Sequence, residues 1–303
     1  MASVRPGSVS FVLFGAVLFG TAGTAAAFAP PEASPTSIGG MRLAIGAIAL
    51  LLAIPLFRGR WRMVPQLLRR PTVWAMAVTT ASYQPLFFGA VDRSGVALST
   101  LLTVGSAPIF SGLLGRILLK QPLTGAWITA TGVAILGLTL RSWGEFEIGD
   151  ELGPVMAVAA GLAIAGYFVA AKAELSRGAH AVALPATAYG LGALLLLPVL
   201  LTQPLAWVAT FEGITLAVYL GVMTMAVANV SVIVGLRGMA PGPAATLQLA
   251  DPLTATLLGV LVLGERISVV GTLGVALVLV ALVVQSRALT RATKPVPIAP
   301  QLL

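Results

Sequence analysis

Residues 246–265 read TLQLADPLTATLLGVLVLGE and place an aspartate, Asp251, directly before Pro252 inside an otherwise apolar run. The next acid along the chain is Glu265, and the nearest preceding base is Arg237. The sequence therefore shows no local partner for this carboxyl group. What the carboxyl group does at this position depends on the solvent that surrounds the segment.

The composition of the chain indicates a lipid environment. Hydrophobic residues make up 58% and charged residues 9% of the sequence, and the mean hydropathy is +0.99, whereas a soluble domain carries about 25% charged residues. Apolar runs of about 20 residues, the length at which a helix crosses a bilayer, recur along the chain. Because these runs are continuous and do not alternate in polarity, they predict helices and not barrel strands.

We therefore predict an all-α integral membrane protein with ten transmembrane helices. Most connections between the runs are short, which leaves no room for a domain outside the membrane. The predicted spans are residues 9–29, 36–56, 72–91, 95–119, 124–141, 152–172, 181–201, 213–236, 242–263 and 267–286.

The basic residues indicate how these spans are oriented. The formal net charge is +8 and the isoelectric point is near 10.8. With the N-terminus in the cytoplasm, most basic residues fall on the inner side, and only Arg93, Arg141 and Arg266 lie outside. This asymmetry follows the positive-inside rule. It predicts a multi-pass protein of the cell (inner) membrane with both termini in the cytoplasm, whose basic residues contact anionic lipid headgroups and not nucleic acid.

The first 30 residues permit a second interpretation. A basic residue, an apolar stretch and an alanine-rich tail also fit a cleavable signal peptide. Removal of this segment would leave nine spans and break the internal repeat of the chain. We therefore expect the segment to be retained.

The chain repeats itself at an offset of 144 residues. The segments SAPIFSGLLGRILLKQPLTGAW and LADPLTATLLGVLVLGERISVV overlay with Pro108 on Pro252 and Gly115 on Gly259. Spans three to five thus correspond to spans eight to ten. Because five is an odd number, the second half would cross the membrane in the opposite sense, as in the inverted repeats of many secondary transporters. We expect a first repeat over residues 1–146, a second over 147–290 and a cytoplasmic tail over 291–303.

The most specific stretch of the chain resembles a known family. Ten short spans, MRLAIGAIALLL at residues 41–52, APIFSGLLGRILLKQPL at 107–123 and ADPLTATLLGVLVLGERIS at 250–268 are similar to the EamA-type branch of the drug/metabolite transporter superfamily. The similarity covers roughly residues 9–286. The acid–proline pair here begins with aspartate where the family often has glutamate, and Ala107 replaces the acid in the first half. The resemblance implies a transporter, with export of amino acids, related metabolites or drugs.

Two ionisable residues lie at bilayer depth, where a charge costs a few kcal/mol or more and is a functional hypothesis by default. Asp251 stands near the middle of span nine with Gln248 on the same helix face, and Pro252 is expected to kink the helix there. We interpret Asp251 as a substrate-binding or proton-coupling residue. The alternative is a permanent pair with Arg42, or a helix cap. Arg42, in span two, is expected to serve folding more than transport.

Other polar residues at mid-depth are weaker candidates for the same site. Each could line a binding cavity between the repeats, but such side chains also join packed helices as structural contacts. These candidates are Tyr83 and Gln84 before the kinking Pro85, Thr103 and Ser106 before the kinking Pro108, Asn229, Ser231, Tyr167 and Thr24.

Enzyme chemistry has no support in the sequence. Cysteine is absent, and no G-x-S-x-G, H-E-x-x-H or Walker glycine loop is present. We expect no cofactor and no metal, and as partners a small-molecule substrate, protons where transport is coupled to them, and the lipid bilayer. An integral-membrane channel or a structural membrane subunit remains the alternative function, and the oligomeric state is open.

Overall fold

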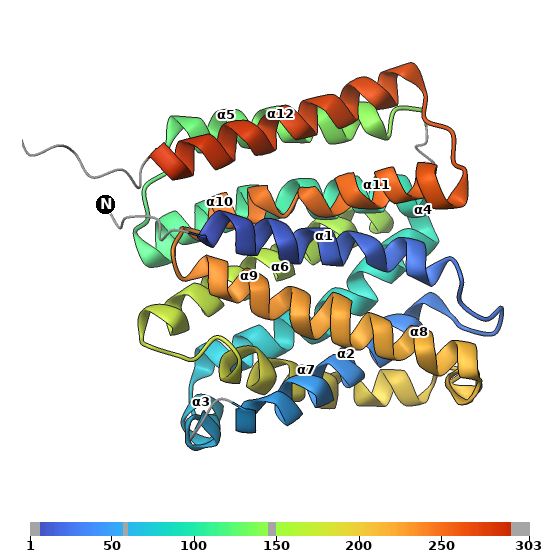
Figure 1. The fold of residues 1–303 in the computed structure, drawn as a ribbon, viewed down its shortest axis with the longest axis vertical. Helices are drawn as coiled ribbons and strands as arrows, with labels where there is room; N and C mark the ends of the chain where they lie inside the picture. Colours follow the sequence, from blue (N-terminus) through green and yellow to red (C-terminus); the bar gives the residue numbers. More distant parts are fainter. Residues whose placement is uncertain (1–6, 57–59, 145–149, 292–303) are drawn as a thin grey trace, which may run out of the picture.

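The computed structural model describes residues 7–56, 60–144 and 150–291, and the regular elements in these ranges are all helical. The predicted tail beyond residue 291 lies outside the described residues. The helices form one bundle and run along a common direction (Figure 1). They are α1 (Ser8–Ala26), α2 (Pro35–Ala53), η1 (Ile54–Leu56), η2 (Arg60–Met63), α3 (Val64–Leu68), α4 (Pro71–Leu119), α5 (Gly125–Arg141), α6 (Leu152–Ser176), α7 (Ala183–Leu201), η3 (Ala206–Ala209), α8 (Phe211–Gly221), η4 (Val222–Val227), α9 (Ala228–Leu236), α10 (Pro241–Leu247), α11 (Ala250–Leu263) and α12 (Val269–Arg291).

By length and composition, 8 helices in the described part of the chain are able to cross a membrane. Three of them are composite: α2 and η1 form one continuous stretch, as do α8, η4 and α9, and also α10 and α11. Helix α5, with 17 residues, is apolar but shorter. Helix α4 has 49 residues and would be about 74 Å long if it were straight. A bilayer's hydrocarbon core is about 30 Å thick, so α4 is too long for a single crossing.

A glycine interrupts this long helix. Gly95 has φ 71° and ψ 166°, a conformation that is open to glycine and strained for other residues. Before Gly95, α4 runs antiparallel to α6. Arg70, just before α4, forms an ion pair with Glu174 near the end of α6. Further along α4, Gly89 packs against Met156 near the start of α6.

After Gly95, successive residues of α4 contact α6 in the opposite order, from its start towards its end. The Thr103 hydroxyl donates a hydrogen bond of 2.9 Å to the carbonyl of Ala157. One turn later Ser106 packs against Gly161, which is further along α6. The contact point therefore moves forward along α6 after Gly95, so α4 reverses its direction at this residue and forms a tight helical hairpin.

Side chains of α6 join several helices at the end of the bundle where α1 begins, here called the basic end. Lys172 Nζ donates hydrogen bonds to the carbonyls of Leu236 and Arg237 at the end of α9, at 2.9 and 3.0 Å. A cation stabilises the last carbonyls of a helix, which lack partners within it. Gly235, beside Leu236, packs against the carbonyl of Ser8 at the start of α1.

A buried carboxylate reinforces the same end. The side chain of Glu174 is 0% exposed. It accepts hydrogen bonds from Arg70 and Thr72 of the α4 segment and from Arg177 Nη1 at 2.8 Å. Because a buried charge is stable only when it is paired and hydrogen-bonded, these donors fix the end of α6 against the start of α4.

The opposite end of α6 is held by an acid in the preceding loop. The Oδ1 atom of Asp150 accepts hydrogen bonds of 3.0 Å from the backbone N–H groups of Leu152 and Gly153, which have no partner inside the helix. Asp150 also pairs with Arg93 of α4. The hydrogen bond from Arg93 lowers the pKa of the Asp150 carboxyl group.

The two halves of the chain are interleaved. The most extensively packed helix pairs each join a helix before residue 146 to one after residue 147: α4 with α6, α5 with α12, α1 with α9 and with α11, and α2 with α7. Figure 1 shows α5 and α12 side by side at one edge of the bundle. Close approach depends on small residues, since a Cβ atom on Gly137 of α5 would lie 2.7 Å from the carbonyl oxygen of Gly274 of α12.

Candidate functional site

Arg42 lies in the middle of α2 and is partly buried. Its Nη2 atom donates a hydrogen bond of 2.9 Å to the carbonyl of Thr224, and its guanidinium carbon lies 5.6 Å from the centre of the Phe19 ring, within cation–π range. Nε is buried and makes no hydrogen bond to the described residues. The guanidinium group is therefore anchored at one nitrogen and retains unused donors.

The anchor of Arg42 is a local irregularity in the neighbouring span. Thr224 belongs to η4, a π-helical stretch between α8 and α9. A π turn interrupts the regular hydrogen-bond ladder and is common at functional sites. Helix α2 comes close to this turn because Gly46 packs against Met225 and the carbonyl of Gly221. The guanidinium group therefore reaches a backbone carbonyl at a point where the ladder is disturbed.

Asp251 lies at a break between two half-helices. Gln248 and Leu249 separate α10 from α11, and the N–H of Asp251 donates to the carbonyl of Gln248 at 2.9 Å. Pro252 has no N–H to give that carbonyl, so the regular α-helical bond cannot form. The predicted kink is therefore present. It places the partly buried Asp251 in the first turn of α11, where the helix dipole favours a negative charge.

Helix α1 packs directly behind this break. A Cβ atom on Gly20 would lie 2.5 Å from the backbone carbonyl oxygen of Asp251. One turn further along α1, a Cβ atom on Gly23 would meet nothing within 4 Å. Helix α1 is therefore in tight contact with α11 beside Asp251 and opens into free space one turn closer to its C-terminus.

Arg42 and Asp251 are close enough to influence each other without direct contact. Their charges interact with each other and with Tyr83, yet no ion pair joins them among the described residues. A permanent Arg42–Asp251 pair is thus not seen. Whether Asp251 acts in transport and Arg42 in folding stays a prediction.

Three further polar side chains form a hydrogen-bonded group beside these charges. The Tyr167 hydroxyl of α6 donates a hydrogen bond of 2.8 Å to Asn229 Oδ1 of α9, and the rings of Tyr167 and Tyr189 lie 5.8 Å apart. Tyr189, in α7, also interacts with Asn229 and with Arg42. Tyr189 was not among the residues predicted from the sequence, although a tyrosine inside an apolar span is the same signal that identified Tyr83.

Some predicted residues are engaged in packing. Thr103 is fully buried and bonds to α6. Ser106 and Ser231 donate to carbonyls of their own helices, those of Thr103 at 3.3 Å and Val227 at 2.9 Å. Such bonds fit the structural alternative considered for these residues.

The remaining predicted positions differ in their surroundings. Gln84 is buried and packs against Gly39 of α2, while Gln248 and Thr24 are partly buried. Pro85 and Pro108 both lie inside α4. Through Gly39, Gln84 stands next to the turn of α2 that carries Arg42.

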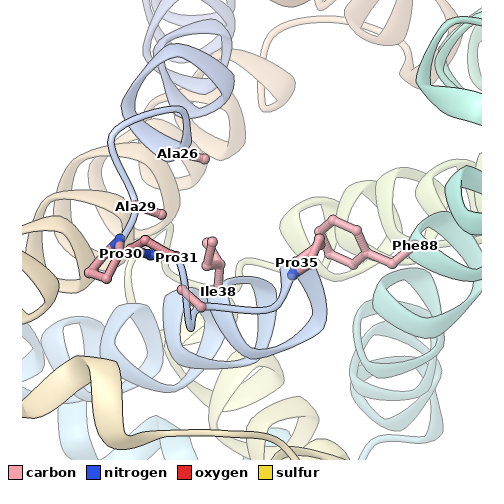
Figure 2. Close-up of a pocket in the computed structure, with 8 residues that line it drawn as sticks. Ala26, Ala29, Pro30, Pro31, Pro35, Ile38 and Phe88 are labelled. Carbon is pink, nitrogen blue, oxygen red and sulfur yellow. The ribbon is translucent and has the colours of Figure 1, made fainter.

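A pocket of about 370 Å³ opens at the end of the bundle opposite the basic end. Figure 2 shows the open space between the α1–α2 connection on one side and Phe88 of α4 on the other, with Pro35 and Ile38 of α2 beside it. The wall is apolar. The lining residues are Ala26, Ala29, Pro30, Pro31, Ala33, Pro35, Ile38 and Phe88.

The described residues offer no metal site, since no three His, Asp or Glu side chains among them gather as ligands of one ion would. The described residues place an apolar pocket at one end of the bundle, one arginine, one aspartate and a tyrosine–asparagine group at mid-depth, and the Lys172 and Glu174 contacts at the basic end.

Comparisons with known proteins agree with this picture. The family model of the EamA-like transporter family matches residues 7–143 and again 151–287. The uncharacterized transporter YwfM of Bacillus subtilis (strain 168) is 38% identical over 283 residues, which cover 92% of this chain and 93% of YwfM. A protein of known crystal structure shares the fold with a TM-score of 0.79 and 19% identity, over 96% of this chain and 100% of its own. The chain therefore belongs to the EamA-like transporter family and is a multi-pass membrane transporter, not an enzyme.

Proposed function

We propose that the protein is a secondary exporter of a small metabolite, such as an amino acid or a related compound, and that it works by alternating access around a central cavity. The single observation that carries the proposal is the difference between the two ends of the bundle. At the basic end Lys172 and Glu174 hold α6 to α9 and to the start of α4, whereas a pocket opens at the other end. A carrier that exposes its site to one side at a time has this form.

Ten spans in two inverted halves are part of the proposal. The hairpin at Gly95 divides α4 into two segments of spanning length, and α5 is apolar over 17 residues. Counted with the other helices, these give ten crossings. The family model matches the chain twice, with equal lengths on either side of the middle. Two copies of five crossings each would have opposite orientations.

A counterflow experiment tests the transport mechanism. Vesicles that contain the purified protein are loaded with one unlabelled amino acid, and the same labelled amino acid is added outside at a low concentration. We expect saturable uptake and a transient accumulation of label above its equilibrium level for at least one of the common amino acids. Equilibration without accumulation would favour the channel alternative, and no flux above that of empty vesicles for any of them would contradict amino acid transport.

The orientation in the membrane gives a separate prediction. With ten spans and the observed distribution of basic residues, both termini lie in the cytoplasm. Alkaline phosphatase, which is active only outside the cytoplasm, should therefore be inactive when fused after Leu303. A matched fusion after Gly144, in a loop expected outside, should be active. The opposite pattern would overturn the predicted topology.

A further inference from the structure

Three helices connect the apolar pocket to Arg42. On α2, the pocket-lining Ile38 stands four residues before Arg42 and so lies on the same helix face. On α1, Ala26 lines the pocket and Phe19, seven residues earlier, contacts the guanidinium group. The pocket and the arginine are therefore one helical turn apart along α2, about 5 Å.

The third helix, α4, also carries a residue that lines the pocket and a residue close to Arg42. Phe88 of α4 lines the pocket, and Gln84, four residues earlier, packs with it against Gly39 of α2. Tyr83, beside Gln84, interacts with Arg42, and its ring stacks on that of Phe87 at 5.6 Å. An apolar group seated between Ile38 and Phe88 would thus lie about one turn of α2 from Arg42.

Arg42 has donors that the protein does not use. One hydrogen bond, from Nη2 to the carbonyl of Thr224, is its only hydrogen bond to the described residues, and its Nε is buried without a partner. A guanidinium group carries five N–H donors and binds carboxylates in a bidentate manner. A buried donor without a partner costs free energy. An anionic ligand would remove this cost.

The charges around Arg42 restrict the anion. The titratable groups near Arg42 are Tyr83, Asp251 and Tyr189, and none is a second cation. A phosphate with two negative charges would meet one arginine and the nearby aspartate. A carboxylate with a single charge matches one guanidinium group, and an ammonium group on the same ligand would be attracted to Asp251.

We infer that Arg42 binds the carboxylate of the transported substrate and that Ile38 and Phe88 bind its apolar substituent, so that these three residues set specificity for small apolar amino or organic acids. This inference rests on the proposed transport function and assigns substrate recognition within that site. The pocket volume of about 370 Å³ is within the range of small-ligand sites, about 300–1,000 Å³. Arg42 is then a binding residue as well as a packing residue.

Equilibrium binding to the purified full-length protein tests the inference with four matched probes. Leucine has all three groups, leucine amide lacks the carboxylate, 4-methylvalerate lacks the amine, and glycine lacks the side chain. We expect leucine and 4-methylvalerate to bind. Leucine amide should bind at least about tenfold more weakly because it cannot form charged hydrogen bonds to Arg42, and glycine because it buries no apolar side chain. In Arg42→Gln the preference for leucine over leucine amide should disappear.

A second variant keeps the test valid if Arg42→Gln does not fold. Ile38→Phe fills the pocket and leaves Arg42 in place, so leucine affinity should fall about tenfold while alanine binding is retained. Ile48→Phe is the control, because Ile48 lies on the same helix and is 55% exposed on its outer surface. Equal binding of leucine and leucine amide to the wild-type protein, or no binding of either carboxylate, would overturn the inference.

The outcomes also separate the inference from the proposed function. Selective leucine binding without counterflow would contradict transport and leave the assignment of Arg42 intact. Counterflow of leucine amide at the rate of leucine would establish a carrier and overturn the role of Arg42. Counterflow of leucine that is lost in Ile38→Phe and kept in Ile48→Phe would support both.

Discussion

Replacing Asp251 with asparagine is expected to reduce accumulation driven by a pH gradient by about 10- to 100-fold, while the protein is still made in normal amounts. Asparagine keeps the size and hydrogen-bonding capacity of the side chain but cannot take up or release a proton. It also cannot attract an ammonium group by charge. Because the side chain makes no ion pair with the described residues, a merely structural role would be little affected by the change.

Two assays distinguish the possible roles of this carboxyl group. If Asp251 couples transport to protons, the variant loses gradient-driven accumulation but retains exchange of substrate across the membrane. If it binds the substrate's amino group, binding weakens even without a gradient. Asp92→Asn provides the matched control, since Asp92 is an exposed residue of α4. Wild-type rates in both assays would leave Asp251 as a packing residue.

The second large effect is expected at the buried carboxylate of the basic end. Arg70→Met removes one of the two arginines that pair with Glu174, whose side chain is 0% exposed. Breaking a buried pair by removing one partner costs about 3–5 kcal/mol. We expect about 2–3 kcal/mol here, because Arg177 and Thr72 still donate to the carboxylate. The measurement is the midpoint of thermal unfolding in detergent, which should fall by several degrees.

A double-mutant cycle separates this pairing from a general effect of losing an arginine. Glu174→Gln removes the charge, so Arg70→Met should cost much less in that background. Arg69→Met changes the exposed neighbour of Arg70 and should leave the unfolding midpoint within about 1 °C of the wild-type value, because exposed substitutions usually change stability by less than 0.5 kcal/mol. Additive effects of the Arg70 and Glu174 substitutions would contradict the assigned pairing.

The general architecture could be predicted from the sequence because few backbone structures can cross a lipid bilayer. Continuous runs of spanning length predicted helices, and the described residues form helices throughout. The break beside Asp251 was also predictable, since proline acts through covalent geometry and needs no knowledge of its neighbours. The reversal falls at Gly95, the first residue of the fourth predicted span. No loop residues mark it, because one glycine with a positive φ is sufficient.

The surroundings of the candidate residues were harder to predict, because they depend on how sequence-distant helices meet. Nothing in the sequence near Thr224 indicates a π turn, so the carbonyl that holds Arg42 was not foreseen. Thr103 and Ser106 are polar residues of the kind that line binding sites, but the side of α4 on which they lie packs against α6. Helical periodicity alone does not say which face receives a ligand and which receives another helix.

The interleaving of the two halves has a consequence for how the protein is made. Helix α1 leaves the ribosome long before its main neighbours α9 and α11, and α5 leaves it long before α12, on which it mainly packs. The small residues that allow these contacts have no partner until almost the whole chain has been synthesised. The early helices must therefore remain in the bilayer as separate spans, and the final bundle assembles only after α12 is inserted. A fragment that ends between the repeats would be left without the surfaces on which it packs.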